Sequence, residues 1–238
     1  DLDTAAQKFQ IFENDIPLEA TETAQRMKLN FGTRRLEAMS IVIMLDYSGS
    51  MFAAASAVDD ATISGAADPL QALYERAVGE LLDSLPYDAR VAIGIFSDRD
   101  PVNTLPLTFL FGANPEPLAQ QKQIFLLDRQ VLKDRLARVA VHDHGATELF
   151  ESVQYAANAM VTYDVDRNKY LSDLSEFPAL ICITDGRVTT PPSQVSATAQ
   201  ALASQGVRFY PVGWGKDVAS SPLVQLALGT GGHYYSTR

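Results

Sequence analysis

Five oxygen-bearing side chains stand where apolar segments of the sequence give way to turns. Three occupy alternate positions after the first long apolar segment, one opens a helical pattern, and one follows a later apolar segment. Two carboxylates and three hydroxyls are hard ligands, which suit Mg²⁺ or Mn²⁺ better than they suit metals that prefer sulfur or imidazole. The five residues are Asp46, Ser48, Ser50, Thr147 and Asp185.

The spacing of Asp46, Ser48 and Ser50 directs their side chains toward one spot where a strand ends in a turn, and Gly49 allows that turn. Such a site offers two carboxylates to a divalent ion, and its hydroxyls donate weakly, so the ion remains electrophilic if one carboxylate acts only through water. An ion held in this way attracts a further anionic oxygen, typically from an Asp or Glu of another protein. The residues therefore predict a metal-dependent protein-binding surface.

The rest of the sequence alternates between strand-like and helical patterns. The strand-like segments are continuous apolar runs, which are typical of strands buried on both faces of a parallel sheet. This alternation predicts a doubly wound α/β fold, in which ligands gather at the carboxyl ends of the strands. We expect strands at 40–45, 90–96, 179–183 and 207–212, shorter strands at 105–111 and 234–235, and helices at 70–85, 132–139, 147–163, 193–204 and 223–228.

The composition excludes several classes of protein. The chain has 238 residues, of which 47% are hydrophobic, and a net charge of −10. The negative charge argues against binding nucleic acid through its phosphates and against a polybasic membrane-surface protein. The single cysteine, Cys182, excludes a disulfide within the chain and zinc sites built from several cysteines. No apolar run reaches the length of a transmembrane helix.

The combination of Asp46-x-Ser48-x-Ser50, Thr147 and Asp185 within Thr-Asp-Gly resembles the metal-ion-dependent adhesion site of von Willebrand factor A domains. The resemblance implies a mostly parallel sheet with one antiparallel edge strand and helices on both faces. It implies Mg²⁺ as the ion, with Mn²⁺ or Ca²⁺ as alternatives, and a partner carboxylate that completes the coordination. By this resemblance, Asp46, Ser48 and Ser50 lie closest to the ion. Thr147 binds directly or through water, and Asp185 usually binds through water.

The resemblance also divides the chain into two parts. Residues 1–38 are expected to form an N-terminal extension with short strands, and residues 39–238 the von Willebrand factor A domain. The stretch 9–17 is similar to bacterial secreted members, which indicates an extracellular, cell-surface or periplasmic protein. We expect inserted loops at 51–69 and 112–130, and the sequence stops where the family's final helix would follow, so we expect that helix to be absent.

Four further residues are candidates for contact with a partner protein. Phe52 follows directly on the predicted metal loop, and Arg187 would attract an acidic partner. Trp214 lies between two glycines and is either an exposed anchor or an aromatic that packs a loop. His144 belongs with His142 to a polar loop, since two histidines fall short of the four ligands of a structural zinc site.

Two other functions remain open at this point. In one, the metal only braces the loops of a structural or regulatory interaction domain. In the other, the protein is a metal-assisted hydrolase or phosphotransferase. The sequence lacks both the Gly-x-Ser-x-Gly nucleophile pattern and the phosphate-binding Gly-x-x-x-x-Gly-Lys-Ser/Thr pattern. Ser48 also stands where an aspartyl phosphotransferase would need a second carboxylate, so we expect no enzymatic activity.

Overall fold

A computed structural model of the chain describes residues 11–13, 16–18, 39–86, 89–97, 106–110, 125–126, 128–139, 148–162, 177–187, 192–215, 218 and 220–237. The strands are β1 (Ile11–Glu13), β2 (Ile16–Leu18), β3 (Met39–Asp46), β4 (Arg90–Phe96), β5 (Thr108–Phe109), β6 (Phe177–Thr184), β7 (Arg208–Gly213) and β8 (Tyr235–Thr237). The helices are α3 (Gly49–Ser56), α4 (Ala61–Ser64), α5 (Pro69–Ser84), α6 (Arg129–Leu136), α7 (Leu149–Thr162), α9 (Pro192–Ser204) and α10 (Ser220–Gly229).

These strands form one sheet in the order β2-β1-β8-β7-β6-β3-β4-β5. From β8 to β4 the neighbours pair in parallel, and β5 pairs antiparallel with β4 at the edge. The predicted mostly parallel sheet with one antiparallel edge strand is therefore confirmed for this part of the chain. Beyond β8, the β1–β2 hairpin continues the same sheet, because β1 pairs antiparallel with β8.

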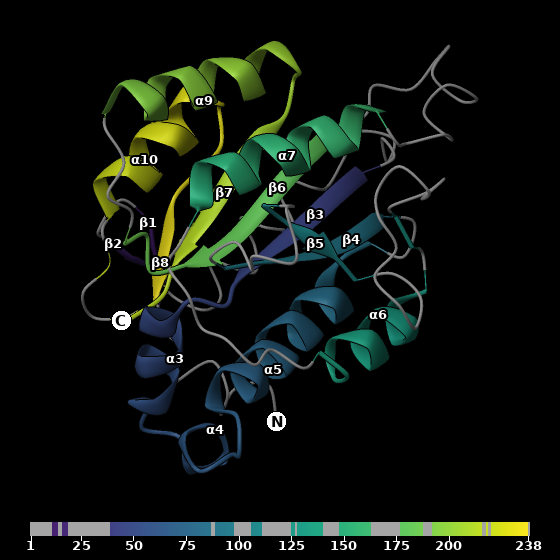
Figure 1. Cartoon of the computed structure of the whole chain (residues 1–238), viewed down its shortest axis with the longest axis vertical. Coiled ribbons are helices and arrows are strands. Elements are labelled where there is room, and N and C mark those ends of the chain that lie inside the picture. The colour runs from purple at the N-terminus through teal and green to yellow at the C-terminus, as the bar shows by residue number, and fades with distance from the viewer. Residues whose placement is uncertain are drawn as a thin grey trace.

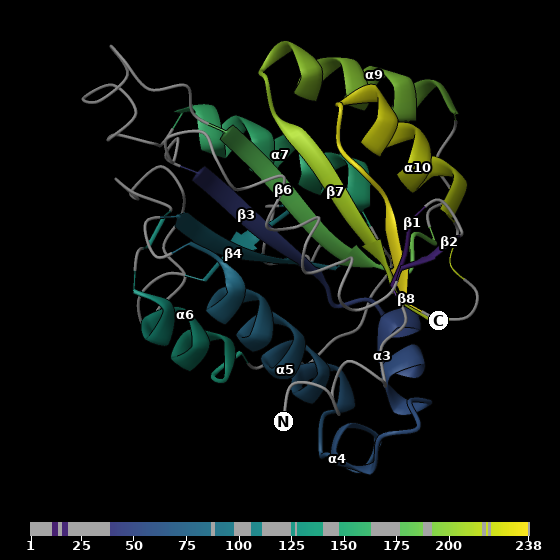
Figure 2. The same cartoon turned by 180° about the vertical axis from the view of Figure 1, so that it is seen from behind.

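Helices cover both faces of the sheet (Figure 1). Helices α7, α9 and α10 lie on one face and α3, α4, α5 and α6 on the other, and the view from behind agrees (Figure 2). Strand β3 lies between the two layers and alternates its side chains between them, as the pleat of a strand requires. Val42 and Met44 belong to the core under α7, α9 and α10, whereas Ile41, Ile43 and Leu45 belong to the core under α3, α5 and α6.

Helix α5 illustrates how local sequence signals set the helices that the patterns predicted. The Asp68 side chain caps its start by accepting a hydrogen bond from the Gln71 N–H, and Pro69 occupies the first turn. The apolar stripe along the helix is buried against the sheet. Its buried residues are Pro69, Leu70, Leu73, Tyr74, Val78 and Leu82.

Among the helices that the structure describes, none combines the length and the hydropathy of a membrane span.

The expectation of a loop at 51–69 is wrong, because this stretch contains most of α3 and all of α4. The segment is rich in alanine, which favours a helix even without a clear apolar stripe. Buried Met51 and Ala55 hold α3 against the domain, and buried Ile63 holds α4. The Asp60 side chain caps α4 by accepting from the Thr62 N–H. Most of the second expected insertion, at 112–130, lies outside the described residues, although α6 begins within it.

Candidate metal-binding site

The turns after β3 and β6 lie side by side at the carboxyl edge of the sheet. The two strands are parallel neighbours, and Leu45 stands opposite Ile183 in their register. The next residues along each strand are Asp46 and Thr184, and Asp185 follows. The Thr184 hydroxyl donates a 2.5 Å hydrogen bond to Asp46 Oδ2. Parallel pairing therefore brings together two segments that are well over a hundred residues apart in the sequence.

The two serine hydroxyls of the first turn converge. Ser48 precedes α3 at the position where serine usually caps a helix, yet its side chain makes no capping bond. The Ser48 hydroxyl instead lies 3.2 Å from the Ser50 hydroxyl. The Ser48 N–H donates to Asp46 Oδ1 over 2.9 Å, which ties the turn to the carboxylate at the strand end. Ser48 thus contacts both Asp46 and Ser50 at the end of β3.

Asp46 is fully buried, and its surroundings hold its orientation. Burial raises the pKa of its carboxyl from 3.8 to about 6, because the charged form loses water. The hydrogen bonds from Thr184 and Ser48 act in the opposite direction, and the nearby charge of Asp185 raises the pKa further. The Tyr74 hydroxyl donates to the Asp46 carbonyl over 2.5 Å, so the main chain is held as well as the side chain.

The chemistry of this cluster fits a hard divalent ion. Asp46 and Asp185 are 0% and 4% exposed, so two carboxylates with mutually unfavourable charges are buried near each other. A divalent cation would offset that cost, and the hydroxyls of Ser48 and Ser50 supply neutral oxygens beside it. Within the described part of the chain, no cluster of three or more His, Cys, Asp or Glu residues could hold a metal. A metal at this site would therefore depend on hydroxyls and water, which disfavours zinc.

The turn after β6 places Asp185 next to a basic residue. Gly186 has φ of 66°, a left-handed conformation that glycine adopts readily, and its N–H donates to the Thr184 hydroxyl over 3.0 Å. The Arg187 N–H donates to Asp185 Oδ1 over 3.0 Å. The Arg187 guanidinium Nε lies 3.6 Å from Asp185 Oδ2. Arg187, whose side chain is 52% exposed, is thus at the rim of the candidate site.

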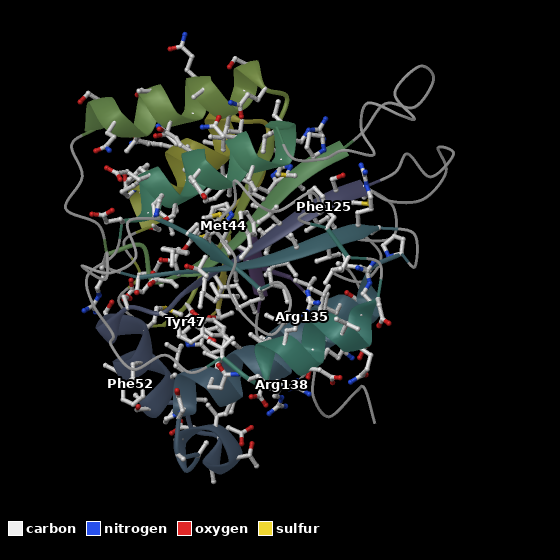
Figure 3. The ribbon with its side chains drawn as sticks, turned by 45° about the vertical axis from the view of Figure 1, so that its right-hand side comes forward. Met44, Tyr47, Phe52, Phe125, Arg135 and Arg138 are labelled. Atoms are coloured by element: carbon white, nitrogen blue, oxygen red, sulfur yellow. The ribbon has the colours of Figure 1, made fainter. Side chains whose placement is uncertain are left out.

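The other predicted site residues are placed differently. Thr147 and His144 lie outside the described residues, which resume just before α7. Phe52 lies on α3 (Figure 3) and is half-buried against the core of that face. Trp214 is 8% exposed within the same core, and its main-chain N–H donates to the Thr184 carbonyl over 2.9 Å. The structure thus contradicts the exposed-anchor reading of Trp214 and agrees with a loop-packing aromatic, because the Trp214 side chain fills core space instead of facing solvent.

Two residues of the site were missed by the sequence reasoning. Thr184 adjoins the recognised Asp185, and a hydroxyl directly before that aspartate was a usable signal. Tyr74 gave no signal, since it reads as one more apolar position on the stripe of α5. Its neighbour Tyr47 packs against it with ring centroids 5.1 Å apart and donates to Gln71 Oε1 over 2.7 Å. Figure 3 shows Tyr47 between the sheet and α5.

Solved structures of similar fold include bacterial and parasite proteins. An aerotolerance-related membrane protein from Bacteroides fragilis aligns with a TM-score of 0.56 at 14% identity, over 83% of this chain and 90% of that chain. BatB from Bacteroides thetaiotaomicron gives 0.54 at 14% identity, over 84% and 90%. Manganese-loaded TRAP protein from Plasmodium vivax gives 0.50 at 15% identity, over 80% and 63%. Identities this low support a shared fold only.

A search of curated proteins finds no match. The family profile described as von Willebrand factor type A domain matches residues 40–238, which is most of the chain. The matched range begins within β3 and includes the turns that carry Asp46 and Asp185. The observed sheet order, with helices on both faces, agrees with that match. The chain therefore belongs to the von Willebrand factor type A domain family.

Proposed function

We propose that the protein is a divalent-metal-dependent protein-binding module that serves in adhesion or assembly. The proposed ligands are Asp46, Ser48, Ser50, Asp185 and Thr147, of which Thr147 lies outside the described residues. The proposed ion is Mg²⁺, with Mn²⁺ or Ca²⁺ as alternatives. The observation that carries the proposal is the pair of hydroxyls, 3.2 Å apart, beside a fully buried aspartate.

The residues of the chain would act mainly by preorganisation. Hydrogen bonds from Thr184 and Ser48 fix both oxygens of Asp46, and Tyr74 fixes its main chain. A bound ion would supply an electrophilic centre, and the carboxylate of an Asp or Glu from the partner would complete its coordination. The manganese-loaded TRAP structure supports the proposal in so far as another protein of this fold holds a divalent ion.

We propose no reaction at this site. The Ser48 and Ser50 hydroxyls lie next to each other, and neither forms a hydrogen bond with a His or Lys base among the described residues. An adjacent base is the usual activator of a serine nucleophile. We also propose a location outside the cytoplasm, at the cell surface or in the periplasm. One similar structure is that of a bacterial membrane protein, which supports this proposal.

A metal that only braces the loops is the second candidate, and the burial of Asp46 favours it. A fully buried carboxylate with a raised pKa destabilises the folded state when it is ionised, and a cation would remove that penalty. The two functions differ in whether the bound ion keeps an open coordination position. A binding module needs a coordination position that exchanges with solvent or a partner, whereas a brace needs none.

Two measurements on the full chain test the proposal. The first compares thermal unfolding in EDTA and in excess Mg²⁺. At a concentration about 100 times Kd, Mg²⁺ should add about 2.7 kcal/mol of stability and raise Tm by roughly 5–10 °C. An unchanged Tm would remove the metal from the proposal. The control variant is Ser56→Ala, a serine on the exposed side of α3, and the test variant carries Ser48→Ala with Ser50→Ala.

The second measurement separates binding from bracing. Mn²⁺ bound with an exchangeable water strongly enhances the relaxation of bulk water protons, and a closed site does not. We expect strong enhancement in the wild-type chain and in Ser56→Ala, and its loss in the double serine variant. Tight Mn²⁺ binding without enhancement would favour the brace and would contradict the binding module.

A further inference from the structure

Arg187 is the positively charged neighbour of a candidate metal ligand. Its guanidinium Nε lies 3.6 Å from Asp185 Oδ2, which is too long for a hydrogen bond and leaves mainly a Coulombic attraction. The Arg187 side chain is 52% exposed, whereas that of Asp185 is 5% exposed. One cation therefore contacts a buried candidate ligand and also reaches solvent at the rim of the site.

This arrangement differs from the other ion pairs that the structure describes. Lys133 pairs with Asp83 and Arg76 with Glu80, whose side chains are 68% and 61% exposed. Arg76 also lies 2.8 Å from Asp60, whose side chain is 16% exposed. Asp185, at 5%, is the most buried carboxylate of these pairs. Pairs between solvent-exposed groups contribute little, because water screens both charges. Asp185 is screened far less, so its interaction with Arg187 has more influence on what else can bind there.

The charges at the site show what Arg187 adds. Asp46 and Asp185, both ionised, cancel the charge of a divalent ion. Without Arg187, the metal-loaded site would be neutral, and with Arg187 it carries one net positive charge. The chain as a whole has a net charge of −10, so its surface repels anions in general. A local positive charge at the rim is what an anionic ligand would need to approach.

We infer that Arg187 couples the divalent ion to a carboxylate ligand; the inference rests on the proposed metal-binding function. Before a ligand arrives, Arg187 weakens ion binding, because two cations compete for Asp185. Once the ion is bound, Arg187 strengthens an anionic ligand by charge-assisted contact. Arg187 thus makes the site select the carboxylate of the proposed function over a neutral amide oxygen, which gains nothing from the extra charge. By linkage, the ion and the carboxylate strengthen each other's binding.

The test uses the full chain, Mn²⁺ and two small probes, acetate and the neutral acetamide. Isothermal titration gives the Mn²⁺ affinity, and the relaxation of water protons reports displacement of metal-bound water by each probe. Arg187→Gln should bind Mn²⁺ about threefold more tightly and acetate about three- to tenfold more weakly. Its response to acetamide should match that of the wild type.

Two control variants make the result specific. Arg187→Lys keeps the charge and should retain most of the preference for acetate. Arg138→Gln removes an exposed arginine near the end of α6 and changes the net charge by the same amount, so it should behave as the wild type. If Arg187→Gln changes neither affinity beyond twofold, or weakens Mn²⁺, the inference is overturned while metal binding stands. A wild-type chain that binds no Mn²⁺ overturns the proposed function and the inference together.

Discussion

The helix starts and the strand ends of this domain use the same residue type in contrasting ways. Asp60, Asp68 and Asp128 stand before α4, α5 and α6, and each side chain accepts hydrogen bonds from main-chain N–H groups of its helix. Asp46 and Asp185 stand at the carboxyl ends of β3 and β6 and are buried. Each of these aspartates, taken alone, marks the boundary between a turn and a helix or strand. Their position in the sheet makes the second group fit for a metal, because parallel neighbours hold them together away from water.

The largest expected effect comes from removing one aspartate of each kind. Asp46→Ala should abolish the stabilisation by Mg²⁺, with an affinity loss of at least about a hundredfold, because it removes a buried charged side chain that is a proposed ligand. Asp68→Ala should lower the free energy of unfolding by about 1 kcal/mol through loss of its helix cap. Its Mg²⁺ affinity should stay within about twofold of the wild type. Isothermal titration and denaturant unfolding measure the two quantities.

If Asp68→Ala loses Mg²⁺ as completely as Asp46→Ala does, the contrast between helix starts and strand ends has no functional meaning. Asp59→Asn, an exposed change near α4 that alters the charge equally, controls for net charge.

A smaller effect is expected from the residue that positions Asp46. Thr184→Val keeps the shape of the side chain but removes the hydroxyl that donates to Asp46 Oδ2. Outer-shell partners of metal ligands typically change metal affinity by about 10- to 100-fold, and we expect a loss of about tenfold for Mg²⁺. Thr184→Ser retains the hydroxyl and should restore most of the affinity in the same titration. Equal losses in both variants would assign the effect to packing instead.

The smallest effect follows from pH. The pKa of Asp46 is about 6 in the folded chain without metal, against 3.8 in a model peptide. This raised value stabilises the fold fully below pH 3.8, and that contribution is lost as pH rises through about 6. Above pH 6 the ionised Asp46 is therefore costly until a cation binds, whereas below it a proton competes with the ion. The increase in Tm with Mg²⁺ should be several degrees larger at pH 7.5 than at pH 5. Asp46→Ala should show no such difference.

The sequence was sufficient to predict the core of the fold. Runs such as 40–45 and 179–183 indicate central strands, since every position in them is apolar or small and the runs are short. Helices α3 and α4 were missed because their stretch of small residues has no clear apolar stripe to mark a buried face. The pairing of β1 with β8 could not be read either, because it joins short segments from opposite parts of the sequence.

The candidate site was predictable to a similar degree. Asp46, Ser48 and Ser50 have a local spacing that sequence alone reveals, and Asp185 follows a recognisable strand. Tyr74 could not be assigned to the site, because its contact with the Asp46 carbonyl depends on how α5 packs across the strand end. The burial of Trp214 likewise depends on neighbours that are distant in sequence.

The hairpin at the sheet edge has a mechanical consequence. Ile11 stands opposite Thr237, so the start of β1 lies beside the end of β8 in an antiparallel pair. A pull that separates these two residues would open their hydrogen bonds one after another, as a zipper opens, instead of shearing them all at once. The β1–β8 contact would then yield at low tension, while the strands that carry Asp46 and Asp185 lie deeper in the sheet and would still be intact.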